Sequence, residues 1–241
     1  MITVRCHQFH LTTVALAIMA IVVETPIAAE ATGTDQSAGS VISTTKAAMA
    51  NESGVHLLLT SKTSSLSTKV VADIGATRGA ETITEGSKEV TIQVTPTYAY
   101  LSGNAAGLTT LMGLTTQEQK KVGTDVITMK VGTTPYKSLK SSVTIPVLAS
   151  LLPVVKGTKF STVVIGGRQY YELKWTTKAT SSTSSSNSVL TLSKGASVLP
   201  LRETATASSG TSTTTFSKWG ERVSVSVPSG SGLIPYSKVL G

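Results

Sequence analysis

Few residues of this 241-residue chain have the chemistry of a catalytic group. Beyond residue 31 the only histidine is His56, which lies in the apolar stretch VHLLLT, and the only cysteine, Cys6, precedes that point. A Ser-His-Asp triad would have to use His56, and the chain has no G-x-S-x-G nucleophile elbow. One histidine without a cysteine excludes the common zinc sites and a Cys-His dyad. We therefore expect a structural role for His56, no catalytic residue, no metal and no cofactor.

Two other patterns of reactive side chains are equally weak. Ser43-Thr44-Thr45-Lys46 matches the S-x-x-K of penicillin-recognising enzymes, but no S-D-N or K-T-G follows. In a chain this rich in serine, threonine and lysine, one such match is expected by chance. The acidic residues stand singly, at positions where carboxylates are usually solvated: Asp73, Glu81, Glu85, Glu89, Glu118, Asp125 and Glu172.

The N-terminus has the features of an export leader. Arg5 precedes an apolar run of 13 residues, 11–23, and Ala29-Glu30-Ala31 follows as a cleavage site. The run is too short to span a bilayer, so we expect residues 1–31 to be a signal peptide, cut after Ala31 or after Ala29. An uncleaved segment that anchors the chain is the alternative. Cys6 does not stand at the cleavage point, as a lipobox cysteine would.

The charge of the mature chain limits its partners. Loss of Arg5, Glu24 and Glu30 leaves 20 basic and 11 acidic residues, or +9. This excess would favour contact with an anionic membrane surface or wall polymer, although the same charge could serve solubility alone. Basic residues are scattered with little aromatic interleaving, so no nucleic-acid partner is expected. We expect a secreted or cell-envelope location, outside the cytoplasmic membrane.

Composition favours one β-rich domain. Hydrophobic residues make up 40% of the chain and charged residues 14%, and threonine and valine, which favour strands, are abundant. The small polar stretch 32–40 is expected to be a flexible tether, and residues 41–241 a single domain.

Two meanders of short strands are predicted, separated by a helical region. Turn residues separate strands at 55–60, 68–73, 81–84, 88–94 and 98–101, and later at 160–165, 168–177, 188–193, 199–205, 212–218 and 223–227. Gly166-Gly167 marks a two-residue hairpin. Helical spacing is predicted for 41–51, 103–113, a segment starting with the Thr115 and Glu118 capping box, and a segment starting at Thr144, and 125–131 is a further strand. Short helices of this kind suit the covering of one sheet face.

Five phrases of the sequence, in this order, carry a resemblance to a known family: GVHLLLTSK, VTPTYAYLSGNAAGLTTLMGLT, VIGGRQYYEL, VLPLRE and TFSKWGERVSVSVP. Together they resemble the actinobacterial envelope lipoproteins that include LppX, LprA, LprF and LprG, whose fold is similar to that of the carrier LolA. The resemblance covers about residues 41–228 and lacks a sharp active-site motif. It departs from the family in one respect, because the lipobox cysteine is absent.

The resemblance implies a mainly β (α+β) fold. This is a strongly curved antiparallel half-barrel sheet of about ten strands, with short helices covering the concave face and Val223–Val227 as an edge strand with Trp219 at the rim. It also implies a hydrophobic cavity for acylated lipid or glycolipid. The candidate lining residues are Leu108, Leu111, Met112, Leu114, Ile145, Leu148, Leu151 and Leu152.

The function expected from these observations is that of an exported, non-enzymatic lipid-binding or lipid-carrier protein, with an unidentified envelope transporter as a further partner. Two alternatives stay open. One is a cell-surface structural or interaction module without a ligand, and the other is a hydrolase that depends on His56.

Overall fold

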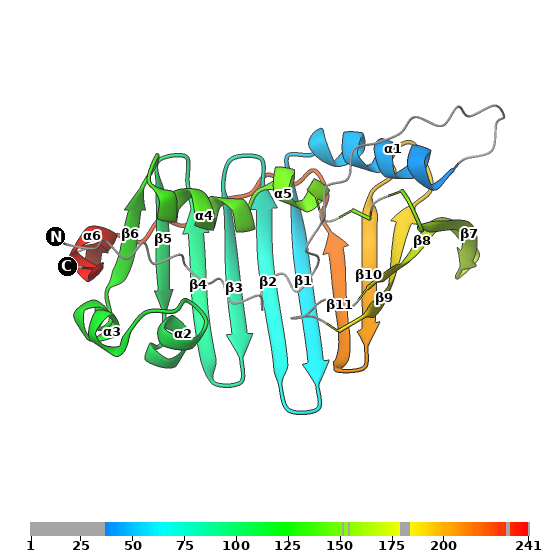
Figure 1. The fold of residues 1–241 in the computed structure, drawn as a ribbon. Helices are drawn as coiled ribbons and strands as arrows, with labels where there is room; N and C mark the ends of the chain where they lie inside the picture. The colour runs from blue at the N-terminus through cyan, green and yellow to red at the C-terminus, as the bar shows by residue number, and fades with distance from the viewer. Residues whose placement is uncertain (1–36, 151, 154, 179–183, 230–231, 241) are drawn as a thin grey trace.

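The computed structural model describes residues 37–150, 152–153, 155–178, 184–229 and 232–240. Its core is one open sheet of twelve strands in the order β12-β6-β5-β4-β3-β2-β1-β11-β10-β9-β8-β7 (Figure 1). All pairings are antiparallel except that of β12 with β6, and the sheet does not close into a barrel. The predicted fold class, a curved sheet with short helices, is confirmed, with twelve strands in place of about ten.

The first six strands form a continuous meander. They are β1 (Gly54–Thr63), β2 (Ser67–Gly75), β3 (Gly79–Glu85), β4 (Lys88–Val94), β5 (Tyr98–Gly103) and β6 (Val126–Lys130). Each pairs with the next along the chain, so the predicted strands of the first half are all present.

The second meander joins the first through its last strand. It consists of β7 (Lys159–Ile165), β8 (Arg168–Thr177), β9 (Ser186–Ser193), β10 (Pro200–Ala207) and β11 (Gly210–Ser217). β11 pairs with β1, so the two halves form one sheet. Gly166 and Gly167 have φ of 58° and 78°, as a two-residue hairpin turn requires, which confirms the predicted β7–β8 hairpin.

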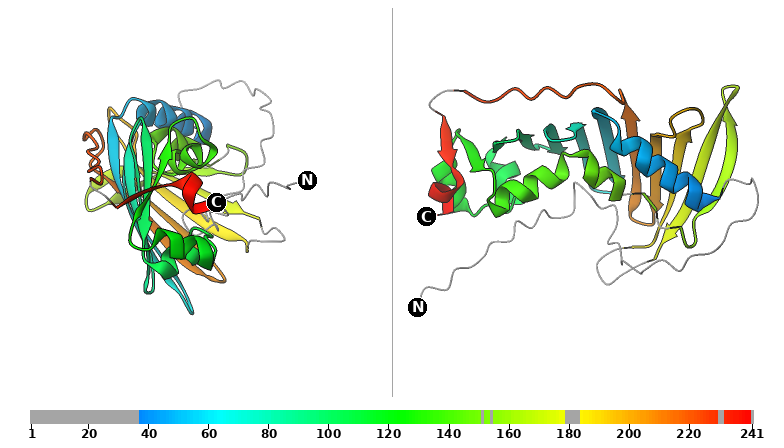
Figure 2. Two further views of the ribbon diagram at one scale, coloured as in Figure 1. Left: turned by 90° about the vertical axis from the view of Figure 1, so that its left-hand side faces the viewer. Right: turned by 90° about the horizontal axis from the view of Figure 1, so that it is seen from above.

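In the part of the chain that the structure describes, six helices flank the sheet: α1 (Ala38–Ala50), α2 (Ala105–Thr110), α3 (Thr116–Val122), α4 (Thr134–Ser142), α5 (Ile145–Ser150) and α6 (Tyr236–Leu240). α1, α5 and α4 follow one another along one end of the strands, and α2 and α3 lie at the other end (Figure 1). Seen end-on, α1, α2 and α5 lie on the same side of the sheet (Figure 2).

Local capping explains where the helices begin. Ser37 and Ser40 form a capping box, so α1 starts at Ala38, inside the segment expected to be a tether. The predicted box of Thr115 with Glu118 caps α3. α4 was not predicted, although Thr133 caps it and Tyr136 and Leu139 are buried at helical spacing.

The end of the chain differs from the prediction. Val223–Val227 was expected to be an edge strand, but it is extended and pairs with no strand. Both sides of β11 are already occupied by β10 and β1, so no free ladder adjoins this segment. It instead crosses the face of the sheet opposite the helices, and the chain then adds β12 (Leu233–Pro235) to β6 (Figure 2).

Trp219 closes the corner where this crossing begins. Its indole N–H donates to the Pro200 carbonyl over 2.8 Å, and its ring stacks on Phe216 with 6.2 Å between the centroids. Its role in this position is structural.

Candidate functional site

The helix-covered face of the sheet is apolar along most of its length. Strand partners place buried side chains in rows across the strands, because directly paired residues of antiparallel strands point to the same face. One row follows consecutive pairings from β8 to β4 through Leu173, Leu190, Glu203, Thr214, Leu59, Val70, Ile83 and Val90. All of these side chains are buried. Two of the eight are polar, and both belong to the second meander.

The predicted lining residues are all buried wherever the structure describes them. Leu108, Leu111, Met112, Leu114, Ile145, Leu148 and Leu152 have exposed fractions between 1% and 6%. Leu151 lies outside the described residues.

These residues form two separate sets. The set from 108 to 114 surrounds α2, which lies against the first residues of β4, near Glu89. The set in and after α5 lies at the other end of the strands, where Thr144 bridges to Gly75 at the end of β2. The structure therefore does not bring the two predicted sets together.

The helices of the two sets also differ in how they contact the sheet. A Cβ atom at Gly107 in α2 would lie 2.2 Å from the Glu89 carbonyl oxygen, so α2 is packed directly on β4. The main contact of α1, in contrast, is with α5. α1 spans the side of the sheet formed by β11 to β8, and β7 and β8 curl toward the helices (Figure 2).

Two buried acidic residues lie on the helix-covered face. Glu81 on β3 is 4% exposed and Glu203 on β10 is 6% exposed, and burial raises the pKa of each from 4.5 to about 7. For Glu81 a side-chain hydrogen bond with Ser142 partly opposes the rise in pKa. For Glu203 burial alone accounts for the rise in pKa.

The expectation that single acidic residues are solvated is thus wrong for Glu81, and also for Glu85, which is 5% exposed and paired with Lys88 over 2.8 Å. Glu81, Ile83 and Glu85 are spaced two residues apart along β3, so the two acids point to the same face as the apolar Ile83. This two-residue spacing around an apolar residue could have revealed that both acids are buried. Glu203 was not singled out in the sequence, since the register irregularity between Pro200 and Arg202 breaks the alternation of β10.

A third feature of this face is Trp175 on β8. Its indole nitrogen is buried and has no hydrogen-bond partner, and the same is true of one oxygen each of Glu81 and Glu203. Ser188, directly opposite Trp175 on β9, is 4% exposed. Two of these three unpartnered atoms, those of Trp175 and Glu203, lie in the β8–β11 part of the face.

His56 lies on the opposite face of the sheet. Its Nδ1 is 2.8 Å from Asp73 Oδ1 on β2, and Ser217 is its direct partner on β11. These three residue types are those of a hydrolase triad. However, among the described residues no hydrogen bond joins Ser217 to His56, and a triad requires that bond. The pairing with Asp73 gives His56 a structural role.

The S-x-x-K match also lies apart from the buried face. Ser43 and Lys46 are exposed on α1, whereas Val41, Ile42, Thr45 and Met49 form its buried side. Within the described ranges, no group of three or more His, Cys, Asp or Glu side chains could hold a metal ion. Likewise, no helix in the described part of the chain is both long and apolar enough to cross a membrane.

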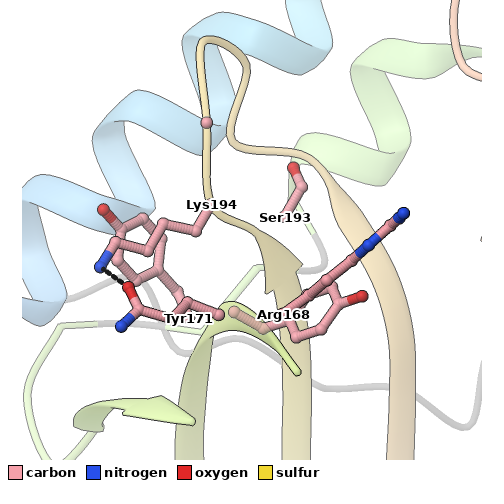
Figure 3. A pocket seen from close by; sticks show the side chains of 7 residues that line it. Arg168, Tyr171, Ser193 and Lys194 are labelled. Carbon is pink, nitrogen blue, oxygen red and sulfur yellow. Dashed lines mark hydrogen bonds between the residues drawn. The ribbon is translucent and has the colours of Figure 1, made fainter. Parts of the chain in front are cut away.

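A surface pocket of about 670 Å³ lies between the first residues of β8 and the end of β9 (Figure 3). Lys194 donates to the Gln169 side chain over 2.7 Å and lies over the Tyr171 ring, at 5.5 Å from its centroid. The Arg168 side chain extends away from this group, because successive residues of a strand point to opposite faces. The two cations do not converge on one point, and we assign no ligand to this pocket.

Comparison with known proteins finds structures of similar fold, but no matching protein-family model or curated sequence. The fold is that of an open half-barrel with helices on one side, and it is similar to that of LprF from Mycobacterium bovis. That likeness has a TM-score of 0.50 and 14% identity, over 79% of this chain and 96% of LprF.

Two further structures are similar. The lipoprotein LppX of Mycobacterium tuberculosis has a TM-score of 0.48 and 16% identity, over 79% of this chain and 100% of LppX. An uncharacterised conserved protein of Thermus thermophilus has a TM-score of 0.44 and 9% identity, over 83% and 99% of the two chains. At the level of the fold, the likeness to LprF confirms the resemblance to the LppX and LprF type of protein.

Proposed function

We propose that this protein is a non-enzymatic lipid-binding protein of the bacterial cell envelope, which holds acyl chains against the helix-covered face of its sheet. The observation that carries the proposal is the apolar face between β1 and β8, spanned by a helix, α1, whose main contact is another helix.

The lining would come mainly from the α5 side. α5, which carries Ile145 and Leu148, lies beside α1, and these two residues and Leu152 are buried. Leu108, Leu111, Met112 and Leu114 were expected in the same role, but the close packing of α2 on β4 favours ordinary core for them. In this proposal the acyl chains therefore lie under α1 and α5.

Burial alone supplies enough free energy for such a ligand. Each buried methylene contributes about 0.8 kcal/mol, so a chain of about sixteen carbons gains on the order of 10 kcal/mol before ordering costs. No reactive side chain is needed. The absence of a Ser217–His56 hydrogen bond in the described part of the chain also favours binding over hydrolysis.

Export and transport belong to the same proposal. The leader expected in residues 1–31 would place the chain outside the cytoplasmic membrane, and its fold resembles that of envelope lipoproteins. We propose acylated lipid or glycolipid as the cargo and an envelope transporter as a partner. The charge of +9 expected after cleavage favours approach to an anionic membrane surface.

Mass spectrometry of organic extracts tests the proposal. Protein purified from its own cells should release acyl lipid in a fixed ratio to protein. A Leu148→Trp variant, which places an indole in the ligand's space, should release much less. Ser43→Ala, on the solvent face of α1, is the matched control and should release as much as the wild type.

If neither the extract nor reconstitution with lipid yields a complex, the protein has no such ligand. The alternative of a structural or interaction module at the cell surface would then be favoured.

A further inference from the structure

Glu203 is a buried acid that lacks a hydrogen bond at one of its two carboxyl oxygens. Its side chain is 6% exposed, and Oε1 has no partner. Its direct neighbours on the same face are Leu190 on β9 and Thr214 on β11, and neither carries a charge. Arg202 precedes it on β10 and is exposed. No cation therefore faces Glu203 from the strands on either side.

Trp175 supplies a second unpartnered group on the same face. Trp175 pairs with Ser188, and Ser188 pairs with Ala205, which is two residues beyond Glu203 on β10. Trp175 and Glu203 are therefore separated by two strand spacings across the sheet and by two residues along a strand. Ordinary strand spacing and rise place their Cα atoms on the order of 12 Å apart. Ser188, in β9 between their strands, and Thr214, beside Glu203, are also buried. Four polar side chains share a small area of an otherwise apolar face.

Folded proteins rarely leave buried polar atoms without partners, because each such atom loses its bond to water without replacement. Glu81, the matched acid in the first half of the sheet, hydrogen-bonds Ser142 at the end of α4, which leaves only its Oε2 without a partner. Within the described ranges, Oε1 of Glu203 and the indole nitrogen of Trp175 have no such helix partner. Their missing partner is best supplied by a ligand.

The chemistry of the two groups defines the ligand atoms. An indole N–H only donates hydrogen bonds. Burial raises the pKa of Glu203 to about 7, so below that pH its carboxyl group is protonated and donates as well. Two donors on an apolar face require acceptors attached to an apolar body, and the carbonyl oxygens of ester-linked acyl chains fit this description.

We propose that Trp175 and Glu203 hydrogen-bond the ester carbonyl oxygens of a bound acyl lipid, with Ser188 and Thr214 beside them. The inference rests on the proposed lipid-binding function and adds the position of the ester linkage. The acyl chains then extend from this point along the row of Leu173, Leu190 and Leu59.

A pair of matched ligands tests the inference. Delipidated protein is titrated at about pH 6 with a diacylglycerol and with the dialkyl ether of the same chain length, which lacks only the carbonyl oxygens. The wild type should prefer the ester about tenfold, since each hydrogen bond of this kind contributes roughly a three- to tenfold factor. Trp175→Phe and Glu203→Met should each remove part of this preference while the ether binds as before.

Two controls separate hydrogen bonding from folding. Glu203→Gln keeps a donor and should retain most of the preference, and Glu81→Gln should leave it unchanged. Equal affinity of the wild type for ester and ether would overturn the polar anchor but leave lipid binding in place. Failure to bind either ligand would overturn both proposals.

Discussion

The two halves of the sheet bury their apolar faces in different ways. In the half built from β2 to β6, helices α2 and α4 pack directly on strands, and the buried acid Glu81 has a hydrogen-bond partner in α4, although its Oε2 has none. In the half built from β8 to β11, the helix α1 packs on another helix, and Glu203 and Trp175 have buried atoms without partners. The first half has the properties of a structural core. The second half has the properties expected of a ligand-binding surface.

The largest expected effect compares two leucines. Leu101 on β5 is fully buried, and Leu101→Ala should lower the free energy of unfolding of ligand-free protein by about 3–5 kcal/mol. Leu190→Ala on β9 should cost about half as much or less, because a ligand site is less tightly packed. Urea unfolding monitored by circular dichroism measures both. Equal losses would show that the two halves are packed alike.

The pH dependence of stability compares the two acids. Both have a folded-state pKa of about 7 against 4.5 in the unfolded chain. The unfolded chain therefore releases protons that the folded chain keeps, and stability is full below about pH 4.5 and falls as the pH rises to about 7. Each acid contributes a loss of about 3 kcal/mol.

The variants Glu81→Gln and Glu203→Gln should each remove about half of this pH-dependent loss in ligand-free protein. Bound ester lipid accepts a hydrogen bond from protonated Glu203, so it should raise the pKa of Glu203 further and enlarge the pH-dependent loss of stability that Glu203 contributes. It should leave the contribution of Glu81 unchanged. The measurement is the free energy of unfolding between about pH 4 and about pH 8. A pH profile that lipid shifts equally in both variants would contradict the comparison.

The smallest effect is expected from added volume. Leu111→Trp beside α2 should destabilise delipidated protein by about 1–3 kcal/mol, because an overpacked core must distort. Leu148→Trp in α5 should leave the melting temperature nearly unchanged and abolish lipid binding. If Leu148→Trp melts as low as Leu111→Trp, α5 belongs to the core as well. The delipidated form is needed because ligand stabilises by mass action.

Much of the fold follows from local sequence. Alternating β-branched residues and glycine turns predicted the strands of both meanders, and the Thr115 capping box predicted α3. The path of Val223–Val227 could not be predicted, because it depends on β11 having both neighbours already. The same holds for Glu203 and Trp175. Their lack of partners is a property of the assembled face, and no pattern within β8 or β10 alone records it.

The pairing of β1 with β11 has a consequence for how the chain folds. β1 forms near the start of the sequence, but its second neighbour spans Gly210–Ser217, and Ser53 donates a hydrogen bond to the Gly220 carbonyl, 167 positions away. Contacts of such long sequence separation form slowly, because the entropy of closing a large loop is lost before the new hydrogen bonds stabilise the pairing. Until then one edge of β1, with Leu57 and Leu59, is an open template for strands of other molecules. The seam at the centre of the finished sheet is thus the last part to assemble and the point where misassembly would begin.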